Sequence, residues 1–304
     1  MEVKEGVSAR QLIREGTFRL GNSRLCEILL SELLEVGRTV LYLDRSPLPE
    51  EISDRFFEGI EGLKRGEPLQ YFLGKATFME KTFKVTPDCF IPRPATETLV
   101  EVCLDYFPAD SGERIAYRKK EGIDYSLSAK RSTLFIDVGT GSGCIAISLT
   151  KRSGCSTMLA IDLCQEALQV ARRNGHLHGV SQRISWLCGD LFSPLKAGRV
   201  LADAILSNPP YIPSEEIGSL PPEIRREPRV ALDGGRDGLH FYRRIAQEFP
   251  PFLKEGGTLF LEIGDFQKER VEELFSRKGF RCVEVRRDLQ EIPRVMVFRK
   301  ESHG

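Results

Sequence analysis

The sequence predicts an α/β fold built on a doubly wound, mostly parallel sheet, with a small all-helical domain in front of it. From residue 134 onward, short apolar and β-branched runs alternate with segments of helical periodicity, which is typical of strand–helix–strand units. Residues 8–65 instead carry helical periodicity. The last two apolar runs, near Val283 and at 295–298, predict a closing hairpin, so the final strand is expected to be antiparallel.

The N-terminal helices are expected at residues 8–20, 23–36 and about 49–65, because apolar side chains recur there at helical spacing. In the second of these segments the apolar stripe consists of Leu25, Ile28, Leu29 and Leu33. Such a stripe needs a partner to cover it, so these helices are predicted to pack together around a core of their own.

We expect three parts in the chain: a helical domain at residues 1–75, a hairpin linker at 76–89 and a larger domain at 90–304. The linker is expected because apolar side chains such as Phe78 and Phe83 alternate with polar ones. Within the larger domain, residues 107–132 are polar and contain few large apolar side chains, which predicts a surface insertion.

A glycine-rich turn follows the first predicted strand of the larger domain, at residues 134–138, and precedes a predicted helix at 144–149. The turn consists of Gly139, Thr140, Gly141, Ser142 and Gly143. Its three glycines remove side chains where a ligand must approach the backbone. The spacing G-x-G-x-G differs from the G-x-G-x-x-G that holds a pyrophosphate, so a nucleoside without a diphosphate is favoured over NAD. A plain tight turn is the alternative.

Carboxylates end the next two predicted strands. Asp162 follows the apolar run at 158–161, about 20 residues past the glycines, where such a side chain accepts hydrogen bonds from ribose hydroxyls. Asp190 follows the run at 184–188, where it could accept from an adenine amine while Leu191 packs on the ring. A helix N-cap is the alternative for Asp162, and an ordinary Gly-Asp turn for Asp190. With the glycines, these acids predict a nucleoside crevice at the carboxyl ends of parallel strands.

The stretch Asn208-Pro209-Pro210-Tyr211 follows the apolar run at 204–207. Each proline fixes its own φ and restrains the residue before it, so the loop is stiff. It can therefore aim the Asn208 side-chain oxygen and the Pro209 carbonyl together, beside the aromatic wall of Tyr211. This set suits a planar, uncharged NH2 group, such as an amide or the exocyclic amine of a base. Alone, the four residues would indicate only a turn.

These motifs resemble those of the class I S-adenosylmethionine-dependent methyltransferases and, more narrowly, of the peptide chain release factor N5-glutamine methyltransferases. The narrower resemblance rests on segments before and after the glycine turn, at residues 68–74, 90–101 and 227–239. It extends from about residue 68 to residue 264 and is very specific.

The resemblance implies a Rossmann-like methyltransferase domain with S-adenosylmethionine as cofactor. It also implies methyl transfer to the glutamine side-chain nitrogen in the Gly-Gly-Gln motif of class 1 release factors, which act in translation termination. The helical domain would dock the body of the factor. The expected cofactor-binding residues are Gly139, Thr140, Gly141, Ser142, Gly143, Asp162, Asp190, Leu191 and Asn208.

The expected acceptor site is built from Asn208 and Pro209 as catalytic oxygens, with Pro210 and Tyr211 beside them. The resemblance adds Phe90 as a second apolar wall for the flat group; packing under the hairpin is its alternative. It also implies that Arg93 and Glu97 organise the cap over the cofactor, or form a purely structural ion pair.

Three other functions compete with this one. One is that of a sister group, which methylates a glutamine of a ribosomal protein. The sequence of residues 92–97 favours the release-factor group over this one. An N6-adenine methyltransferase would also hold a planar NH2 group. It would need a basic cleft or an added DNA-reading domain, and the sequence indicates neither. A non-catalytic S-adenosylmethionine-binding protein is disfavoured by the intact Asn208 and glycines.

The composition and charge of the chain limit the classes of partner and ligand that are expected. The 304 residues include 44 Lys plus Arg and 44 Asp plus Glu, whereas a protein that clamps nucleic acid usually carries a basic excess. We therefore expect no direct nucleic-acid partner, and no metal, because His176, His178 and Cys188 do not make a full ligand set. No apolar run reaches membrane-spanning length, and no signal peptide or C-x-x-C pair is found. A cytoplasmic monomer with reduced cysteines is expected.

Overall fold

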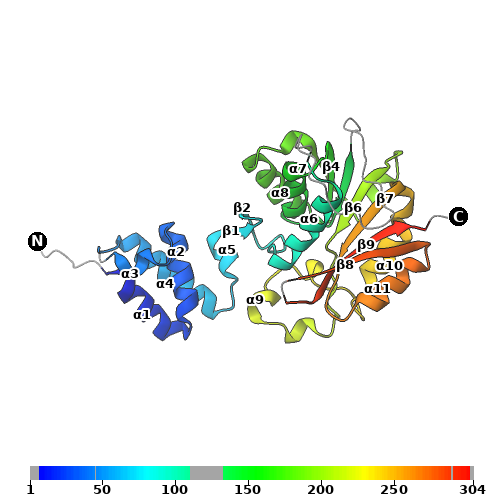
Figure 1. The fold of residues 1–304 in the computed structure, drawn as a ribbon. Helices are drawn as coiled ribbons and strands as arrows, with labels where there is room; N and C mark the ends of the chain where they lie inside the picture. Colours follow the sequence, from blue (N-terminus) through cyan, green and yellow to red (C-terminus); the bar gives the residue numbers. More distant parts are fainter. Residues whose placement is uncertain (1–6, 45, 110–132, 289, 302–304) are drawn as a thin grey trace, which may run out of the picture.

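The computed structural model describes residues 7–44, 46–109, 133–288 and 290–301 (Figure 1). Its larger part is built on a seven-stranded sheet with the strand order β5-β4-β3-β6-β7-β9-β8. The strands are β3 (Leu134–Val138), β4 (Thr157–Asp162), β5 (Ile184–Cys188), β6 (Ala202–Ser207), β7 (Leu253–Glu262), β8 (Phe280–Arg287) and β9 (Pro293–Lys300). β9 runs antiparallel to both of its neighbours, β7 and β8, and the other strand pairs of this sheet are parallel. The predicted α/β fold, with its antiparallel last strand, is therefore confirmed.

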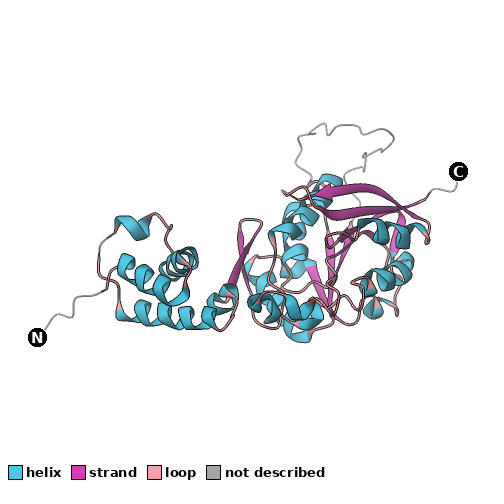
Figure 2. Cartoon of the chain, turned by 90° about the horizontal axis from the view of Figure 1, so that it is seen from below, coloured by secondary structure: helices cyan, strands magenta, loops and turns pink. Residues whose placement is uncertain are grey.

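Helices cover both faces of the sheet (Figures 1 and 2). One layer contains α6 (Pro94–Tyr106), α7 (Cys144–Arg152) and α8 (Gln165–Leu177), and the other contains α10 (His240–Glu248) and α11 (Lys268–Ser276). Successive residues of β3 point into opposite layers, since Phe135 joins the core under α6 and α7, while Ile136 joins the core under α10 and α11. Burial on both faces explains why this strand is apolar except at Asp137, whose carboxylate accepts from the Thr140 hydroxyl over 2.6 Å and from the Ala146 N–H over 3.2 Å.

The N-terminal part is helical and has its own core, which includes the fully buried Leu12, Leu29 and Phe56. Its helices are α1 (Ala9–Leu20), α2 (Ser23–Leu34), α3 (Val40–Leu43), α4 (Glu50–Lys64) and α5 (Leu69–Leu73). The three longer ones match the predicted segments to within two residues. The short α3 and α5 were not predicted, because four or five residues are too few to display a helical period.

A two-stranded hairpin follows the helices, with β1 (Lys75–Phe78) paired antiparallel to β2 (Lys81–Lys84). It lies between the helical part and the sheet in Figure 2. The division at residues 75, 89 and 90 stays a prediction, and residues 110–132 of the expected insertion lie outside the described residues.

A long segment after β6 returns toward the helical part. It contains the short helix α9 (Pro222–Arg225), next to which the Arg226 guanidinium donates to the Arg65 carbonyl over 3.2 Å. The remaining helices are short 3-10 turns at Ser181–Arg183, Ser193–Leu195, Ile217–Ser219, Arg229–Ala231 and Pro250–Phe252. Within the described ranges, no helix combines the length and apolarity needed to cross a membrane.

The N-terminus of α2 offers a test of the helical part. The Asn22 side chain accepts a hydrogen bond from the Leu25 N–H over 3.1 Å, satisfying a helix donor that would otherwise lack a partner. Asn22→Ala is expected to lower the free energy of unfolding by about 1 kcal/mol, as measured by chemical denaturation. Thr39→Ala is the control, because the Thr39 side chain makes no capping bond at α3. Equal stability of the two variants would contradict this account of the cap.

Candidate functional site

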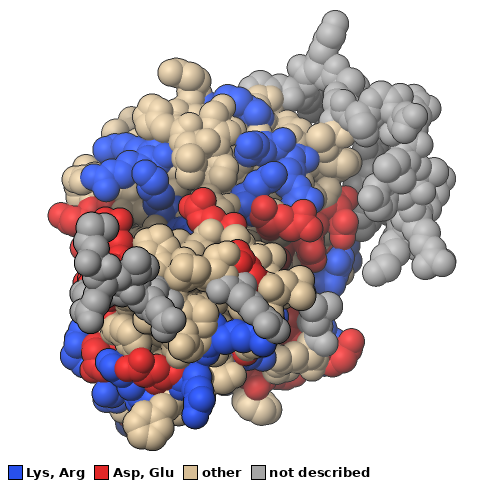
Figure 3. Space-filling model, turned by 90° about the vertical axis from the view of Figure 1, so that its left-hand side faces the viewer, with Lys and Arg blue, Asp and Glu red and all other residues tan. Residues whose placement is uncertain are grey.

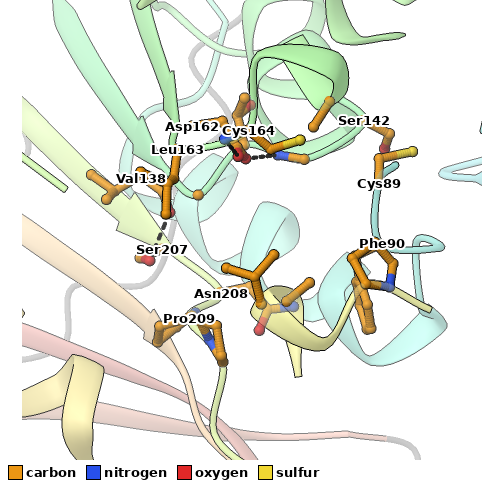
Figure 4. A pocket seen from close by; sticks show the side chains of 18 of the residues that line it. Cys89, Phe90, Val138, Ser142, Asp162, Leu163, Cys164, Ser207, Asn208 and Pro209 are labelled. Atoms are coloured by element: carbon orange, nitrogen blue, oxygen red, sulfur yellow. Dashed lines mark hydrogen bonds between the residues drawn. The ribbon is translucent and has the colours of Figure 1, made fainter. Parts of the chain in front are cut away.

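A cavity of about 330 Å³ lies at the carboxyl ends of β3, β4 and β6. Figure 4 shows it from close by, with Asn208, Pro209 and Phe90 on one side and Asp162, Cys164 and Ser142 across from them. Its volume falls in the usual range for small-molecule sites. Of the residues predicted for the site, the cavity is lined by Phe90, Gly139, Thr140, Gly141, Ser142, Asp162, Asp190, Leu191, Asn208, Pro209, Pro210 and Tyr211. Gly143 is not part of the lining.

The glycine turn presents bare backbone to the cavity at two positions. Gly139 and Gly141 have φ of 76° and 54°, in the left-handed region, and a Cβ added to either would meet no described atom within 4 Å. At Gly143 an added Cβ would lie 3.1 Å from the Ala171 Cβ and 3.2 Å from the Trp186 ring. The third glycine therefore allows a helix to pack closely, and its predicted contact with a cofactor stays a prediction.

Asp162 holds the glycine turn in place. Its Oδ2 accepts from the Gly141 N–H over 2.7 Å, and its Oδ1 accepts from the Cys164 N–H over 2.9 Å at the start of α8. Burial raises the pKa of Asp162, and these backbone hydrogen bonds oppose that rise. Each carboxylate oxygen can accept more than one hydrogen bond, so capacity remains for a diol in the cavity. The helix-start and ligand roles expected as alternatives are compatible.

Asp190 is held in place by an arginine of the opposite helix layer. Both of its oxygens receive hydrogen bonds from the Arg244 guanidinium of α10, over 3.0 and 2.9 Å. Arg244 also contacts Glu248, so the carboxylate belongs to a small ionic network. The role of Asp190 toward an adenine amine stays a prediction, and Arg244, which lies 54 positions away, was not predicted as its partner. Leu191, with φ of 47°, lines the cavity beside it.

Asn208 is anchored from behind by a residue of α6. Its Nδ2 donates to the Thr96 Oγ1 over 3.1 Å, and Thr96 is almost completely buried. The end of β6 is fixed as well, because the Ser207 hydroxyl donates to the Val138 carbonyl of β3 over 2.7 Å (Figure 4). Thr96 was not predicted as a partner of Asn208. Since the amide nitrogen is engaged by Thr96, the Asn208 oxygen is the atom left for a ligand.

Arg93 and Glu97 do not form with each other the ion pair given as the alternative to their predicted role over the cofactor. Arg93 pairs with the buried Glu227, which also accepts from the Ile91 N–H over 3.0 Å. Its guanidinium carbon lies 4.8 Å from the centre of the Phe90 ring, which faces the cavity. Glu97 instead accepts from the Met79 N–H of the hairpin over 2.6 Å. Arg93, which lines the cavity next to Phe90, and Glu227 thus support the Phe90 wall.

Tyr211 is held by close backbone contacts. Its carbonyl accepts from the Gln267 Nε2 over 2.9 Å, and burial raises the pKa of its phenol to about 12, so the ring stays neutral. A Cβ added at Gly234 would lie 2.7 Å from the Tyr211 Cα, a contact that demands backbone movement.

Gly234→Ala is therefore expected to displace this loop and to lower the free energy of unfolding by about 1–3 kcal/mol, as for other overpacked sites. Thermal unfolding with the control Gly218→Ala checks this, because a Cβ at Gly218 meets no described atom within 4 Å. A Gly234→Ala protein as stable as that control would refute the packing argument.

His176 and His178, which were predicted not to bind a metal, do not line the cavity. His178 Nε2 is 3.0 Å from the Thr82 carbonyl of the hairpin. No group of three His, Cys, Asp or Glu side chains that could hold a metal occurs in the described part of the chain.

Comparison with known proteins places both parts of the chain. Residues 125–220 match the model of the methyltransferase small domain, and residues 11–74 match that of the PrmC N-terminal domain. Among curated relatives, the release factor glutamine methyltransferase of Thermodesulfovibrio yellowstonii is 33% identical over 96% of this chain and 97% of its own. The protein of that name from Geobacter sulfurreducens is 40% identical over 85% of this chain and 83% of its own. That from Aquifex aeolicus is 35% identical over 92% of this chain and 92% of its own.

Proposed function

This chain belongs to the release factor glutamine methyltransferase family, and from that premise we propose that it methylates the side-chain nitrogen (N5) of the glutamine in the Gly-Gly-Gln motif of class 1 release factors. The observation that carries the proposal is the orientation of Asn208. Its nitrogen donates to Thr96, so its oxygen is available to accept from a planar NH2 group.

S-adenosylmethionine fits the other half of the cavity as methyl donor. Gly139 and Gly141 leave bare backbone for a close approach, and Asp162 keeps acceptor capacity for the ribose hydroxyls. When bound, this molecule supplies an electrophilic methyl group on a sulfonium sulfur.

The acceptor side must overcome the weak nucleophilicity of an amide. The amide lone pair is delocalised into the carbonyl, and the nitrogen becomes cationic as the methyl group arrives. Two preorganised acceptors for its N–H groups stabilise that charge and hold the nitrogen in line for attack. We assign these roles to the Asn208 Oδ1 and the Pro209 carbonyl. Phe90 and Tyr211 form the walls that exclude water.

The distribution of charge on the surface supports a protein as the partner rather than a nucleic acid. The net charge of the chain is zero, and on the face seen in Figure 3 basic and acidic side chains are interspersed. Such a surface lacks the single basic field that phosphate neutralisation requires. We propose that the helical part docks the body of the release factor, and that the enzyme acts as a cytoplasmic monomer. All eight cysteines are free, which suits a reducing compartment.

The test incubates the protein with labelled S-adenosylmethionine and four acceptors: a purified release factor, its variant with the Gly-Gly-Gln glutamine replaced, total ribosomal protein, and duplex DNA. We expect label on the intact factor alone. Label on the substituted factor would refute the glutamine assignment. Label confined to ribosomal protein or to DNA would instead support the sister glutamine methyltransferases or an N6-adenine methyltransferase.

A further inference from the structure

A buried carboxylate lies directly behind the acceptor site. Glu262 is the last residue of β7 and is only 1% exposed. In the parallel pairing of β6 with β7, Ser207 is aligned with Leu261, so the chain positions that follow are Asn208 and Glu262. Glu262 does not line the cavity, so it can act on a ligand there only through another residue.

The Glu262 carboxyl group is a neighbour of both Asn208 and Thr96, the residue that holds Asn208. The Asn208 Nδ2 donates to the Thr96 Oγ1 over 3.1 Å, and both side chains favour the ionised form of Glu262, as hydrogen-bond donors do. An ionised carboxylate can only accept hydrogen bonds. The side of the amide that faces Glu262 must therefore be its NH2 group, and the oxygen is turned the other way.

The surroundings of Glu262 set its charge. Burial raises the pKa of Glu262 to about 7, against the opposing effects of Thr96, of the Arg294 guanidinium on β9, and of Asn208. The other titratable groups that face it are the phenols of Tyr211 and Tyr242. Burial raises the pKa of both phenols, so they stay neutral. Arg294 is shared with Asp288, 2.8 Å away, and Glu262 Oε2 has no hydrogen-bond partner among the described residues.

We propose that Glu262 is a positioning residue, whose ionised carboxylate orients the Asn208 amide with its oxygen toward the acceptor nitrogen. Protonation removes this control, because a neutral carboxylic acid can donate to the Asn208 oxygen and stabilise the reversed amide. The proposal rests on the function assigned to Asn208 above. It makes methyl transfer pH-dependent through a group that touches neither the donor nor the acceptor.

The kinetic test compares the wild-type protein with Glu262→Gln. A glutamine can either donate or accept, so it no longer dictates the orientation of Asn208. We expect kcat at pH 8 to fall roughly threefold to tenfold, the contribution of one hydrogen bond, with the KM for S-adenosylmethionine unchanged. The wild-type kcat should rise with pH through about pH 7, where Glu262 ionises, and Glu262→Gln should lack that acid limb.

Matched measurements separate positioning from folding. Glu284→Gln changes a partly buried carboxylate on β8 that hydrogen-bonds to Arg286, and it should keep the wild-type kcat and pH profile. The unfolding temperature of Glu262→Gln at pH 8 should not fall, because the variant removes a buried charge. In an Asn208→Ala background, Glu262→Gln should have no further effect on kcat.

A direct readout does not depend on the identity of the acceptor. The side-chain NH2 resonances of Asn208, followed by NMR against pH, should show an inflection near pH 7 that Glu262→Gln lacks. If no acceptor is methylated but the inflection is present, the proposed function fails and the coupling of Glu262 to Asn208 stands. An absent inflection, or a Glu262→Gln protein with wild-type kcat and an intact acid limb, would overturn the inference.

Discussion

Asn208→Ala is expected to lower kcat for glutamine methylation by about tenfold to a few hundredfold. The variant removes one of two acceptors that stabilise the developing positive charge, and a hydrogen bond to a charged group contributes about 1.5–3 kcal/mol. The Pro209 carbonyl remains, so some activity should persist. Because the effect belongs to the transition state, kcat and kcat/KM should fall together in steady-state assays with a release factor.

The control for this variant is Asn22→Ala, which removes an asparagine from the start of α2 in the helical part. It should keep the wild-type kcat even if its stability is lower. Asn208 is also one of the expected cofactor-binding residues, so calorimetry should show weaker but persistent binding of S-adenosylmethionine in Asn208→Ala, because Gly139, Gly141 and Asp162 remain. Wild-type turnover by Asn208→Ala would remove Asn208 from the mechanism.

Asp162→Asn is expected to weaken the binding of S-adenosylmethionine by about tenfold to a hundredfold. Both oxygens of Asp162 accept from backbone N–H groups, of Gly141 and of Cys164. An asparagine must therefore place its NH2 group against an N–H, whichever way its amide is turned. The lost charge-assisted bond and the displaced glycine turn together amount to about 1.5–3 kcal/mol.

Asp203→Asn is the matched control for this experiment. Asp203 also accepts from a backbone N–H, that of Leu134 over 2.8 Å, and it pairs with Lys254. It lies near the amino end of β6, away from the cavity at the carboxyl ends of the strands. It should lose stability and keep its affinity for S-adenosylmethionine. Equal losses of affinity in the two variants, measured by calorimetry, would mean that Asp162 acts only through folding.

The strands and the residues lining the cavity could largely be predicted from the sequence, because both follow from short-range patterns. The strand predicted at 184–188 has the observed bounds, since it is apolar and ends at a Gly-Asp turn. The glycine turn and the loop after β6 were recognised from contiguous residues. Their meeting in one cavity follows from a general rule, that the carboxyl ends of parallel strands share one edge.

The partners of these residues could not be predicted, because they come from distant parts of the chain. Thr96 lies 112 positions from Asn208, and Glu227 lies 134 positions from Arg93. Neither pairing leaves a local pattern. Glu262 did carry a signal, since a carboxylate that directly follows the buried apolar run at 259–261 must find partners or change its pKa. The packing role of Gly143 could not be predicted either, because close packing and ligand approach demand the same residue type.

The most direct test of the account is a crystal structure of the protein with S-adenosylhomocysteine and a release factor. The account predicts that the Asn208 Oδ1 and the Pro209 carbonyl both lie within hydrogen-bonding distance, about 2.7–3.2 Å, of the glutamine side-chain nitrogen. It also predicts that this nitrogen points toward the sulfur. A complex in which residues 208–211 are turned away from the cavity, with the glutamine held by other groups, would contradict it.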